Sequence, residues 1–326
     1  MPILPVHAMY SFEITPADPA RLGVAFSLAF ADVAPKEREL RVQTMQQMAM
    51  QQTAMPQMAM PQATVPGLFT AIQDGNLTGA IYSQLCPDKT LLLWPPGTLV
   101  DTVEKDAELR AALYRHIDRY AEEIGAGPII AFVEDRPQKE LADAGFEYIS
   151  DILTLVADEI AFPMETGESR LSFVSGAPET VFEEMLPLFE RTFEQTNDFP
   201  ALVKITPTIE VLRSYQTNAG YRPDLWFFAQ NGEERVGCLI LTDHPESGPL
   251  ELTYLGLLPE HRGRKYAYPL VQHAQRSARL LGRRMVTVSV DSKNQAAIHV
   301  YTRCGFRPWG KKSLYVKANR SYPKSM

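Results

Sequence analysis

Residues 255–271 read LGLLPEHRGRKYAYPLV, and this stretch decides how the second half of the chain folds. An apolar run ends at Pro259, a burst of positive charge follows, and apolar residues then recur at helical spacing from Tyr266. The pattern predicts a strand, a tight turn and a helix. The first turn of a helix leaves backbone N–H groups without partners, and the helix dipole makes that end positive. The turn is therefore suited to bind a phosphate or diphosphate.

The elements around this stretch follow the same order in both halves of the chain. In the second half we expect strands at 170–175, 248–258, 285–290 and 313–317, and a hairpin of two strands at 225–243. We expect helices at 179–196, 266–281 and 295–303. In the first half we expect a helix over 19–44, then strands at 68–76, 78–85, 90–94 and 128–133, with the strand at 90–94 stopped by Pro95. We also expect a helix at 105–124, and a short helix followed by a strand within 138–149. The triplet Ala144-Gly145-Phe146 matches Cys304-Gly305-Phe306, 160 residues later.

A polar, irregular segment, DEIAFPMETGES (158–169), separates the two copies. We therefore expect two domains, residues 1–165 and 166–326, as two copies of one α+β unit. Copies of one unit need not share a function.

The composition is that of a globular protein with a buried core, because 45% of the 326 residues are hydrophobic and 22% are charged. No apolar stretch approaches the roughly eighteen residues of a membrane helix. The N-terminus has no signal-peptide pattern, so we expect a cytoplasmic protein that does not bind membranes. Three scattered cysteines fit a reducing compartment and have no metal-ligand spacing, so we expect no metal.

The net charge of −7 is unevenly distributed along the chain. Residues 1–165 hold 11 Lys and Arg against 23 Asp and Glu, whereas residues 166–326 hold 21 against 16. A basic half suits an anionic ligand, although an ordinary difference in surface composition would give the same numbers. No basic run with interleaved aromatic residues is present, which argues against nucleic-acid binding.

A low-complexity segment interrupts the first half. Four tandem pentads, QQMAM, QQTAM, PQMAM and PQATV, run from Gln46 to Val65, and six of the twelve methionines lie between Thr44 and Pro66. A methionine-lined site for a metal or a partner is one interpretation. We favour a mobile surface insert over residues 44–66, because the segment has no charge, no aromatic residue and no histidine.

The charged turn resembles the diphosphate turn of the GNAT acyltransferase superfamily. The family pattern Q/R-x-x-G-x-G/A is matched by Arg262-Gly263-Arg264-Lys265-Tyr266-Ala267, with lysine in place of the first motif glycine. A second segment, NQAAIHVYTRCGF (294–306), resembles the family's N-x-x-A-x-x-x-Y-x-x-x-G-F segment at the expected distance. The resemblance implies an α+β fold of two tandem GNAT-like domains with a degenerate N-terminal copy. Each domain would be a mixed, mostly antiparallel central sheet flanked by helices.

The resemblance also implies direct transfer of an acetyl group from acetyl-CoA to a primary amine of a small molecule or peptide. Tyr301 should protonate the departing thiolate, with an ordinary core tyrosine as the alternative. Lys265 should hold a phosphate as a point charge and preserve the turn if its backbone is right-handed helical. Main-chain groups of the fourth strand and of the turn should hold the cofactor. The residues expected to bind it are Leu257, Leu258, Arg262, Gly263, Arg264, Lys265, Tyr266, Ala267 and Asn294.

Glu251, at the start of the fourth strand, is the candidate general base. A solvated strand-end glutamate is an equal alternative, and Tyr254 and His244 are weaker candidates. In the first half, Leu141 stands where the second half has Tyr301, and no charged turn follows the strand at 90–94. We therefore expect the N-terminal copy not to transfer acyl groups.

Two other functions remain open. The chain could be a catalytically silent acyl-CoA-binding or partner-binding protein, in which Lys265 reflects lost catalysis. An aminoacyl transferase that uses charged tRNA is disfavoured by the acidic first half. The acceptor should bind near residues 189–202 and 243–250. The sequence does not fix the oligomeric state, and a monomer that forms its own pseudo-dimer is one possibility.

Overall fold

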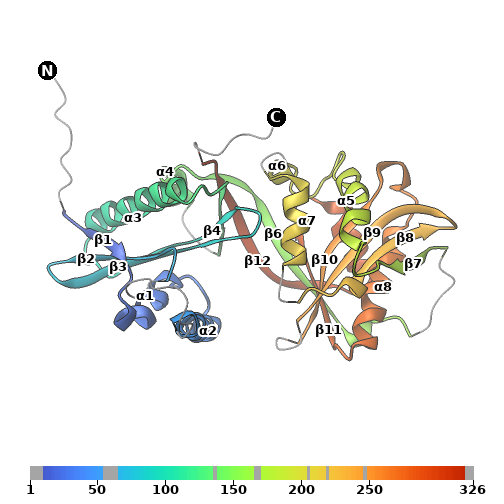
Figure 1. Cartoon of the computed structure of the whole chain (residues 1–326), viewed down its shortest axis with the longest axis horizontal. Coiled ribbons are helices and arrows are strands. Elements are labelled where there is room, and N and C mark those ends of the chain that lie inside the picture. The colour runs from blue at the N-terminus through green and yellow to red at the C-terminus, as the bar shows by residue number, and fades with distance from the viewer. Residues whose placement is uncertain are drawn as a thin grey trace, which may run out of the picture. The chain divides into compact units, whose positions relative to one another are not determined.

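A computed structural model describes residues 10–53, 65–134, 138–164, 170–203, 206–217, 220–244 and 248–319. Contacts within the chain define two compact units. Unit 1 comprises the described residues of 10–148 together with 314–319, and unit 2 comprises those of 149–313. Each unit is a sheet with helices on both faces (Figure 1).

The sheet of unit 1 has the strand order β1-β2-β3-β4-β5, with the end of β12 beside β5. The pairs β1–β2, β2–β3 and β3–β4 are antiparallel, and the pair β4–β5 is parallel. The strands are β1 (Glu13–Pro16), β2 (Leu68–Gln73), β3 (Asn76–Leu85), β4 (Leu91–Thr98), β5 (Ile129–Val133) and β12 (Arg307–Lys317). The helices are α1 (Leu22–Ala29) and α2 (Pro35–Thr53) on one face, and α3 (Val103–Glu123) and α4 (Gln138–Asp143) on the other (Figure 1).

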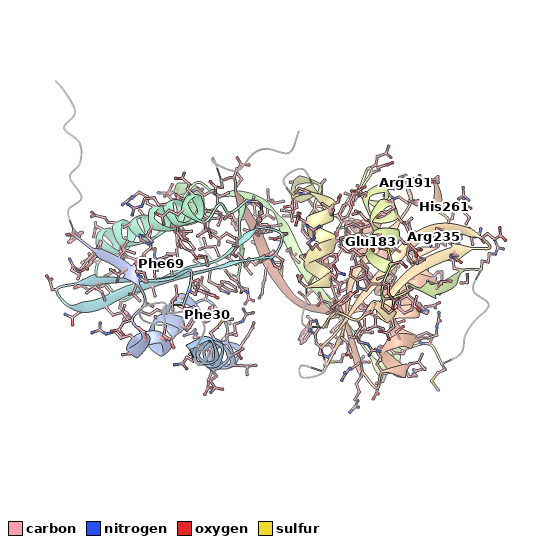
Figure 2. The ribbon with its side chains drawn as sticks, in the orientation of Figure 1. Phe30, Phe69, Glu183, Arg191, Arg235 and His261 are labelled. Atoms are coloured by element: carbon pink, nitrogen blue, oxygen red, sulfur yellow. The ribbon has the colours of Figure 1, made fainter. Side chains whose placement is uncertain are left out.

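Alternation along the strands explains why both faces of this sheet are covered. Successive side chains of a strand point to opposite faces. Phe69 and Ile81 pack against the α3 side, whereas Leu68 and Tyr82 pack against α1 together with Phe30. Figure 2 shows Phe69 and Phe30 on opposite sides of the sheet. Unit 1 therefore has two hydrophobic cores.

Unit 2 has the strand order β7-β8-β9-β10-β11-β6, and β10–β11 is its parallel pair. The strands are β6 (Glu147–Asp158), β7 (Ser172–Ser175), β8 (Trp226–Asn231), β9 (Glu234–Asp243), β10 (Leu250–Leu257) and β11 (Met285–Asp291). Helices α5 (Val181–Thr192), α6 (Pro200–Val203) and α7 (Thr208–Gln216) lie on one face, and α8 (Ala267–Leu280) and α9 (Gln295–Arg303) on the other (Figure 1). Short 3-10 turns cover Pro19–Arg21, Glu159–Ala161, Pro223–Leu225 and Pro259–His261.

The same alternation builds the cores of unit 2. Trp226 and Cys238 pack against α5 and α7, whereas Phe227 and Leu239 pack on the face that α8 covers. The two units thus repeat one architecture, which confirms the α+β fold, with parallel and antiparallel strand pairs in each unit and flanking helices.

The final strand of each unit comes from the other half of the sequence. β6 follows the first-half helix α4, yet it pairs with β11 of unit 2, from Met285 opposite Asp158 to Asp291 opposite Ile152. The end of the chain, residues 314–319, belongs to unit 1. Contacts therefore divide the chain at Ile149, whereas a domain boundary after residue 165 remains a prediction from the sequence repeat.

Two local predictions in the first half are wrong. The helix expected over 19–44 is broken into α1 and α2, and Pro35 starts α2 because proline is favoured in a first helical turn. α2 then continues to Thr53, so the first part of the expected mobile insert is helical. Gln, Met and Ala are good helix formers, and the next helix breaker is Pro56. Residues 54–64 of the insert lie outside the described residues.

β4 also differs from the prediction, because it continues through Pro95 and Pro96 to Thr98. Pairing with β5 ends at Leu93, and the register with β3 shifts at the prolines. A proline at such an irregular, half-paired position costs no ladder hydrogen bond.

In the described part of the chain, no helix has both the length and the apolar character of a membrane span.

The close approach of β9 to β10 gives a test of the unit 2 sheet. Gly237 lies opposite Leu257, and a Cβ at Gly237 would come within 2.2 Å of the Gly256 carbonyl oxygen. We expect Gly237→Ala to lower the free energy of unfolding by about 1–3 kcal/mol in chemical denaturation. Gly310→Ala is the matched control, because a Cβ there meets nothing within 4 Å. Equal destabilisation by the two substitutions would contradict this packing.

Candidate functional site

The candidate site lies where β10 and β11 separate. The two strands pair only from Leu250 to Leu252 with Val286 to Val288. Beyond Leu252, β10 stays paired with β9 through a bulge at Thr253, and no further pair joins it to β11 among the described residues. A bulge bends its strand and disrupts the ladder locally. The result is an opening between two neighbouring strands of one sheet.

A cavity of about 560 Å³ occupies this opening. Its lining comes from residues 252–257 of β10 and 288–290 of β11, from 192 at the end of α5 and 195–198 after it, and from 262–263 and 265–266 of the turn. It is completed by 267, 268 and 271 of α8, by 294 just before α9, and by 296–297 and 299–301 of α9. Of the predicted site residues, the cavity brings together Leu257, Arg262, Gly263, Lys265, Tyr266, Ala267, Asn294 and Tyr301. Leu258, Arg264 and Glu251 are not part of its described lining.

The turn before α8 has free N–H groups, as the sequence predicts. Among the described residues, no hydrogen bond is found for the N–H groups of residues 263–266. The N-terminus of α8 has no side-chain cap at Tyr266 and no acidic residue in its first turn. Arg262 differs from the prediction, because its N–H donates to the Pro259 carbonyl at 3.2 Å. The remaining N–H groups and the helix dipole can accept an anion.

The backbone of Lys265 is left-handed, which corrects the expected right-handed geometry. Its φ is +63°, and that of Gly263 is +75°. Tyr266 follows in the right-handed region, with φ −68° and ψ −22°. A left-handed residue next to a right-handed one turns successive N–H groups toward one side, which makes an anion-binding concavity. A non-glycine residue adopts this geometry at a cost of about 1–2 kcal/mol.

Arg262 holds the turn to the neighbouring elements with its side chain. Its guanidinium donates to the carbonyl of Leu257 at 3.2 Å, of Gln195 at 3.1 Å and of Thr192 at 2.9 Å. The Arg191–Glu260 ion pair, with 2.7 Å between Nη2 and Oε1, ties α5 to the same turn. The cations left to face an anion are therefore those of Arg264 and Lys265.

The backbone of β10 offers different groups from those predicted. The Leu258 N–H donates to the Val236 carbonyl at 3.0 Å, on the β9 side. Because strand residues alternate in direction, Leu255 and Leu257 turn their backbone groups toward the cavity side. Leu255 was not predicted, and Leu258 packs its side chain in the core with α5 and α7.

Asn294 and Tyr301 connect α9 to the cavity. The Asn294 side chain caps α9 by accepting from the Ala297 N–H at 3.2 Å, and it also hydrogen-bonds Asp198. Tyr301 is 7% exposed and lines the cavity. Burial raises the pKa of Tyr301, and the negative charge of Asp198 raises it further. Tyr301 is therefore a neutral hydroxyl over the physiological pH range, able to donate a proton.

A second tyrosine, Tyr254, lies in the cavity wall just after the bulge. Its hydroxyl is 2.6 Å from the Thr192 Oγ1, and its ring stacks on Phe193. Burial raises the pKa of Tyr254 well above its usual value. From the sequence, Tyr254 is only a weaker candidate for the base.

The candidate base Glu251 lies outside the described cavity lining, and its carboxylate is hydrogen-bonded to His244. Its Oε2 lies 2.8 Å from Nε2 of His244. This hydrogen bond raises the pKa of His244, and the negative charges of Glu251 and Asp243 act in the same direction. The pair joins the end of β9 to the start of β10.

The carboxylate that does line the cavity is Asp198, which the sequence analysis did not single out. It lies in the polar segment between α5 and α6, inside the range expected to bind the acceptor. Burial raises the pKa of Asp198, while hydrogen bonds from Asp291 and Asn294 oppose that shift. The run Thr196-Asn197-Asp198 after a helix was the signal available in the sequence.

Comparison with known proteins identifies the segment that contains this site. Residues 182–306 match the Acetyltransferase (GNAT) family. This segment is a GNAT domain. A search of curated proteins returned no match.

Solved structures with the same fold include tandem GNAT proteins. A GCN5-related N-acetyltransferase from Sphaerobacter thermophilus is 14% identical, with 96% of this chain and 98% of that chain covered and a TM-score of 0.63. A tandem GNAT protein from the clavulanic acid biosynthesis pathway is 14% identical, with 97% and 100% covered and a TM-score of 0.50. A glucosamine N-acetyltransferase region of a fungal multi-domain β-N-acetylglucosaminidase is 15% identical, with 94% and 38% covered and a TM-score of 0.59. These likenesses confirm the fold.

Unit 1 repeats the strand geometry of the GNAT domain. Gly79 and Gly97 of unit 1 stand where Gly237 and Gly256 stand in unit 2, and Leu91–Leu93 make the parallel pair with β5. By this register, Pro96 corresponds to Leu255. Proline has no N–H, so this edge of β4 lacks the donor that Leu255 provides.

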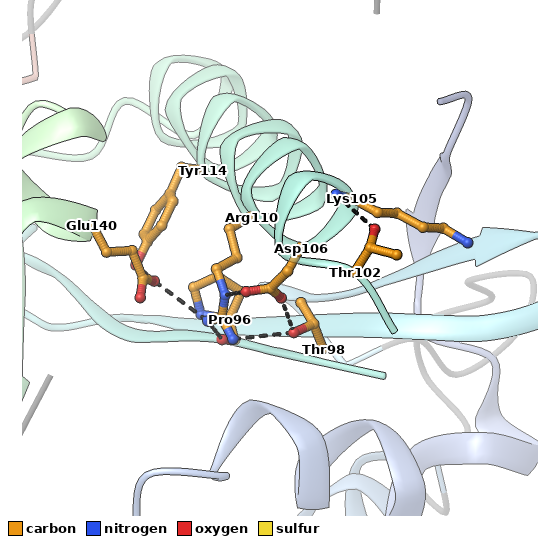
Figure 3. Close-up of polar contacts among 8 residues, drawn as sticks. All are labelled: Pro96, Thr98, Thr102, Lys105, Asp106, Arg110, Tyr114 and Glu140. Atoms are coloured by element: carbon orange, nitrogen blue, oxygen red, sulfur yellow. Dashed lines mark hydrogen bonds and ion pairs between the residues drawn. The ribbon is translucent and has the colours of Figure 1, made fainter. Parts of the chain in front are cut away.

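Side chains of unit 1 make a network of polar contacts around Pro96 and Thr98 of β4 (Figure 3). Arg110 of α3 donates to the Pro96 carbonyl at 2.6 Å, to Thr98 at 3.1 Å and to Asp106 at 2.8 Å. Glu140 of α4 accepts from the Tyr114 hydroxyl at 2.9 Å. The polar groups at this edge are therefore satisfied by unit 1 itself.

The pair His244–Glu251 gives a pH-dependent prediction. We expect Glu251→Gln to lower the pKa of His244 in an NMR titration, because the variant loses the carboxylate charge. A folded-state pKa that is raised adds stability below the pKa of the unfolded histidine, and this stability disappears as the pH rises through the folded pKa. The stability difference between wild type and variant, at most about 1 kcal/mol, should therefore shrink from about pH 5 to pH 8.

The control for this titration is His116 in unit 1, whose pKa is lowered chiefly by burial. Its titration should be the same in both proteins. An unchanged His244 titration in the variant would show that Glu251 is not its partner.

Proposed function

We propose that unit 2 transfers an acetyl group from acetyl-CoA to a primary amine of a small molecule or peptide. The observation that carries this proposal is the convergence on one cavity of an uncapped helix terminus, two strand edges and a buried tyrosine. Free N–H groups at residues 263–266, together with Arg264 and Lys265, suit the diphosphate of the cofactor. The opening between β10 and β11 suits its pantetheine chain.

The groups along the cavity suggest how the transfer proceeds. Backbone groups of Leu255 and Leu257 would align the thioester, because peptide N–H groups can polarise its carbonyl oxygen. The amine nitrogen attacks the carbonyl carbon, and the C–S bond breaks to release the thiolate. Tyr301 would donate its proton to that thiolate, since burial holds the hydroxyl in its neutral form.

Unit 1 would be silent in this reaction for three structural reasons. Pro96 lacks the backbone N–H, Arg110 occupies the Pro96 carbonyl, and Leu141 has no hydroxyl for proton transfer. The link from β4 to α3 covers only 99–102, and the Thr102 side chain caps α3. The corresponding link in unit 2 runs from 258 to 266, which leaves room for the diphosphate turn.

The role of Tyr301 can be tested by removing its hydroxyl. We expect Tyr301→Phe to lower kcat for amine-dependent thiol release by about 100-fold. The affinity for acetyl-CoA, measured by calorimetry, should be unchanged. Tyr315→Phe, which alters an equally buried tyrosine of unit 1, should have no effect on kcat. Binding without turnover, combined with no effect of Tyr301→Phe, would favour a silent acyl-CoA-binding protein.

The assignment to unit 2 predicts one acetyl-CoA per chain in a calorimetric titration. Lys265→Glu should weaken that binding by at least about tenfold, because a charge-assisted contact is lost and a like charge is added. Arg110→Ala in unit 1 should leave the affinity unchanged. Two binding events per chain, or a stronger effect of Arg110→Ala than of Lys265→Glu, would contradict it.

A further inference from the structure

The segment between α5 and α6 is built tightly against the end of β11. The Asp291 N–H donates to Asp198 Oδ1 at 3.2 Å, and the Phe199 N–H donates to Asp291 Oδ2 at 3.3 Å. Gln195 and Phe199 have φ of +52° and +41°, so left-handed residues stand on both sides of Asp198. Such strained conformations persist only where the surroundings fix them. The position of the Asp198 carboxylate is therefore set by the fold.

Asp198 differs from the other carboxylates near the cavity because its oxygens can still accept a hydrogen bond from a ligand. It is the only Asp or Glu in the described lining of the cavity. Asp291 is 2% exposed and already accepts from Ser150 Oγ and from the N–H groups of Lys293 and Phe199. Glu251 is paired with His244. Asp198 accepts from the Asp291 N–H and the Asn294 side chain, which leaves part of its acceptor capacity for a ligand.

Asp198 lines the same cavity as Tyr254 and Tyr301. Its negative charge raises the pKa of Tyr301 on α9 and of Tyr254 on β10. Asp291 of β11 is the other charged group that acts on it. Burial and the negative charge of Asp291 both favour the protonated form of Asp198, compared with the same carboxyl group in water. A carboxylate in such a setting is a better base near neutral pH than a solvated one.

We infer that Asp198 contacts the acceptor amine and removes its proton, so that it is a catalytic residue of the proposed acetyl transfer. The inference rests on the proposed function of unit 2. It also assigns the acceptor a chemical class: an amine that enters beside residues 195–198 as its ammonium ion, drawn by the carboxylate. The polar side chains of Gln195, Thr196 and Asn197 suit an acceptor with hydroxyl or amide groups.

The proton balance of this step is simple. The Asp198 carboxylate takes one proton from the ammonium ion, and the freed lone pair forms the N–C bond to the thioester carbonyl carbon. The C–S bond breaks, and Tyr301 gives its proton to the thiolate. The nitrogen then releases a second proton, which restores Tyr301, and Asp198 returns its proton to solvent. The products are the amide, the free thiol of coenzyme A and one proton.

The test compares Asp198→Asn with wild type in thiol release from acetyl-CoA, with glucosamine, putrescine and glycinamide as acceptor probes. We expect a fall in kcat of about 100-fold or more and unchanged calorimetric affinity for acetyl-CoA. The acidic limb of the wild-type kcat/KM profile, which reports the base, should be absent in the variant. The unfolding midpoint at pH 7 should not fall, since burial disfavours the wild-type charge. Formate should partly rescue Asp198→Ala, which a merely structural role would not allow.

Glu251→Gln is the matched control, because it removes a carboxylate just outside the cavity lining. It should keep most of the wild-type kcat. If wild type is active and Asp198→Asn keeps both its rate and its pH profile, or if Glu251→Gln loses the rate instead, the role of Asp198 is overturned and the proposed function stands. If none of the three amines stimulates thiol release by wild type, the proposed function is overturned, and this inference with it.

Discussion

The site depends on one constraint, the early end of pairing between β10 and β11. A sheet normally satisfies the backbone groups of its inner strands on both sides. Here the bulge at Thr253 keeps β10 attached to β9 while β11 departs toward β6. The edge of β10 from Leu255 to Leu257 is thus left facing a cavity inside the sheet rather than solvent at its rim. Tyr254, Tyr301 and the turn before α8 line the same cavity as this edge.

Arg262 shows how the charge of the turn is divided between structure and ligand binding. Its three carbonyl partners belong to β10, to α5 and to the segment that follows α5. The same guanidinium thus joins the turn before α8 to the loop that carries Asp198. A movement of the turn would therefore change the position of that loop. This link couples the two ends of the site through one side chain.

The sequence predicted those features whose causes are local. The strand that ends before Pro259, the helix that follows the turn and the short helix after Asn294 depend on neighbouring residues, and all are close to where the sequence put them. The nearness of Asp198 to Asp291, 93 residues away, is a tertiary fact that no local pattern carries. The left-handed backbone of Lys265 was missed because lysine disfavours it and only the surrounding turn imposes it.

The exchange of final strands sets an order for assembly during synthesis. β5 acquires its neighbour β12 only when residues 314–317 have left the ribosome, long after the rest of unit 1 has been made. Until then an inner strand of that sheet is a bare edge, which invites pairing with other chains. By contrast, β6 is made before β7 to β11 and waits as a ready partner for β11. Unit 2 can thus complete its strands before unit 1, whose last strand is made at the end of synthesis.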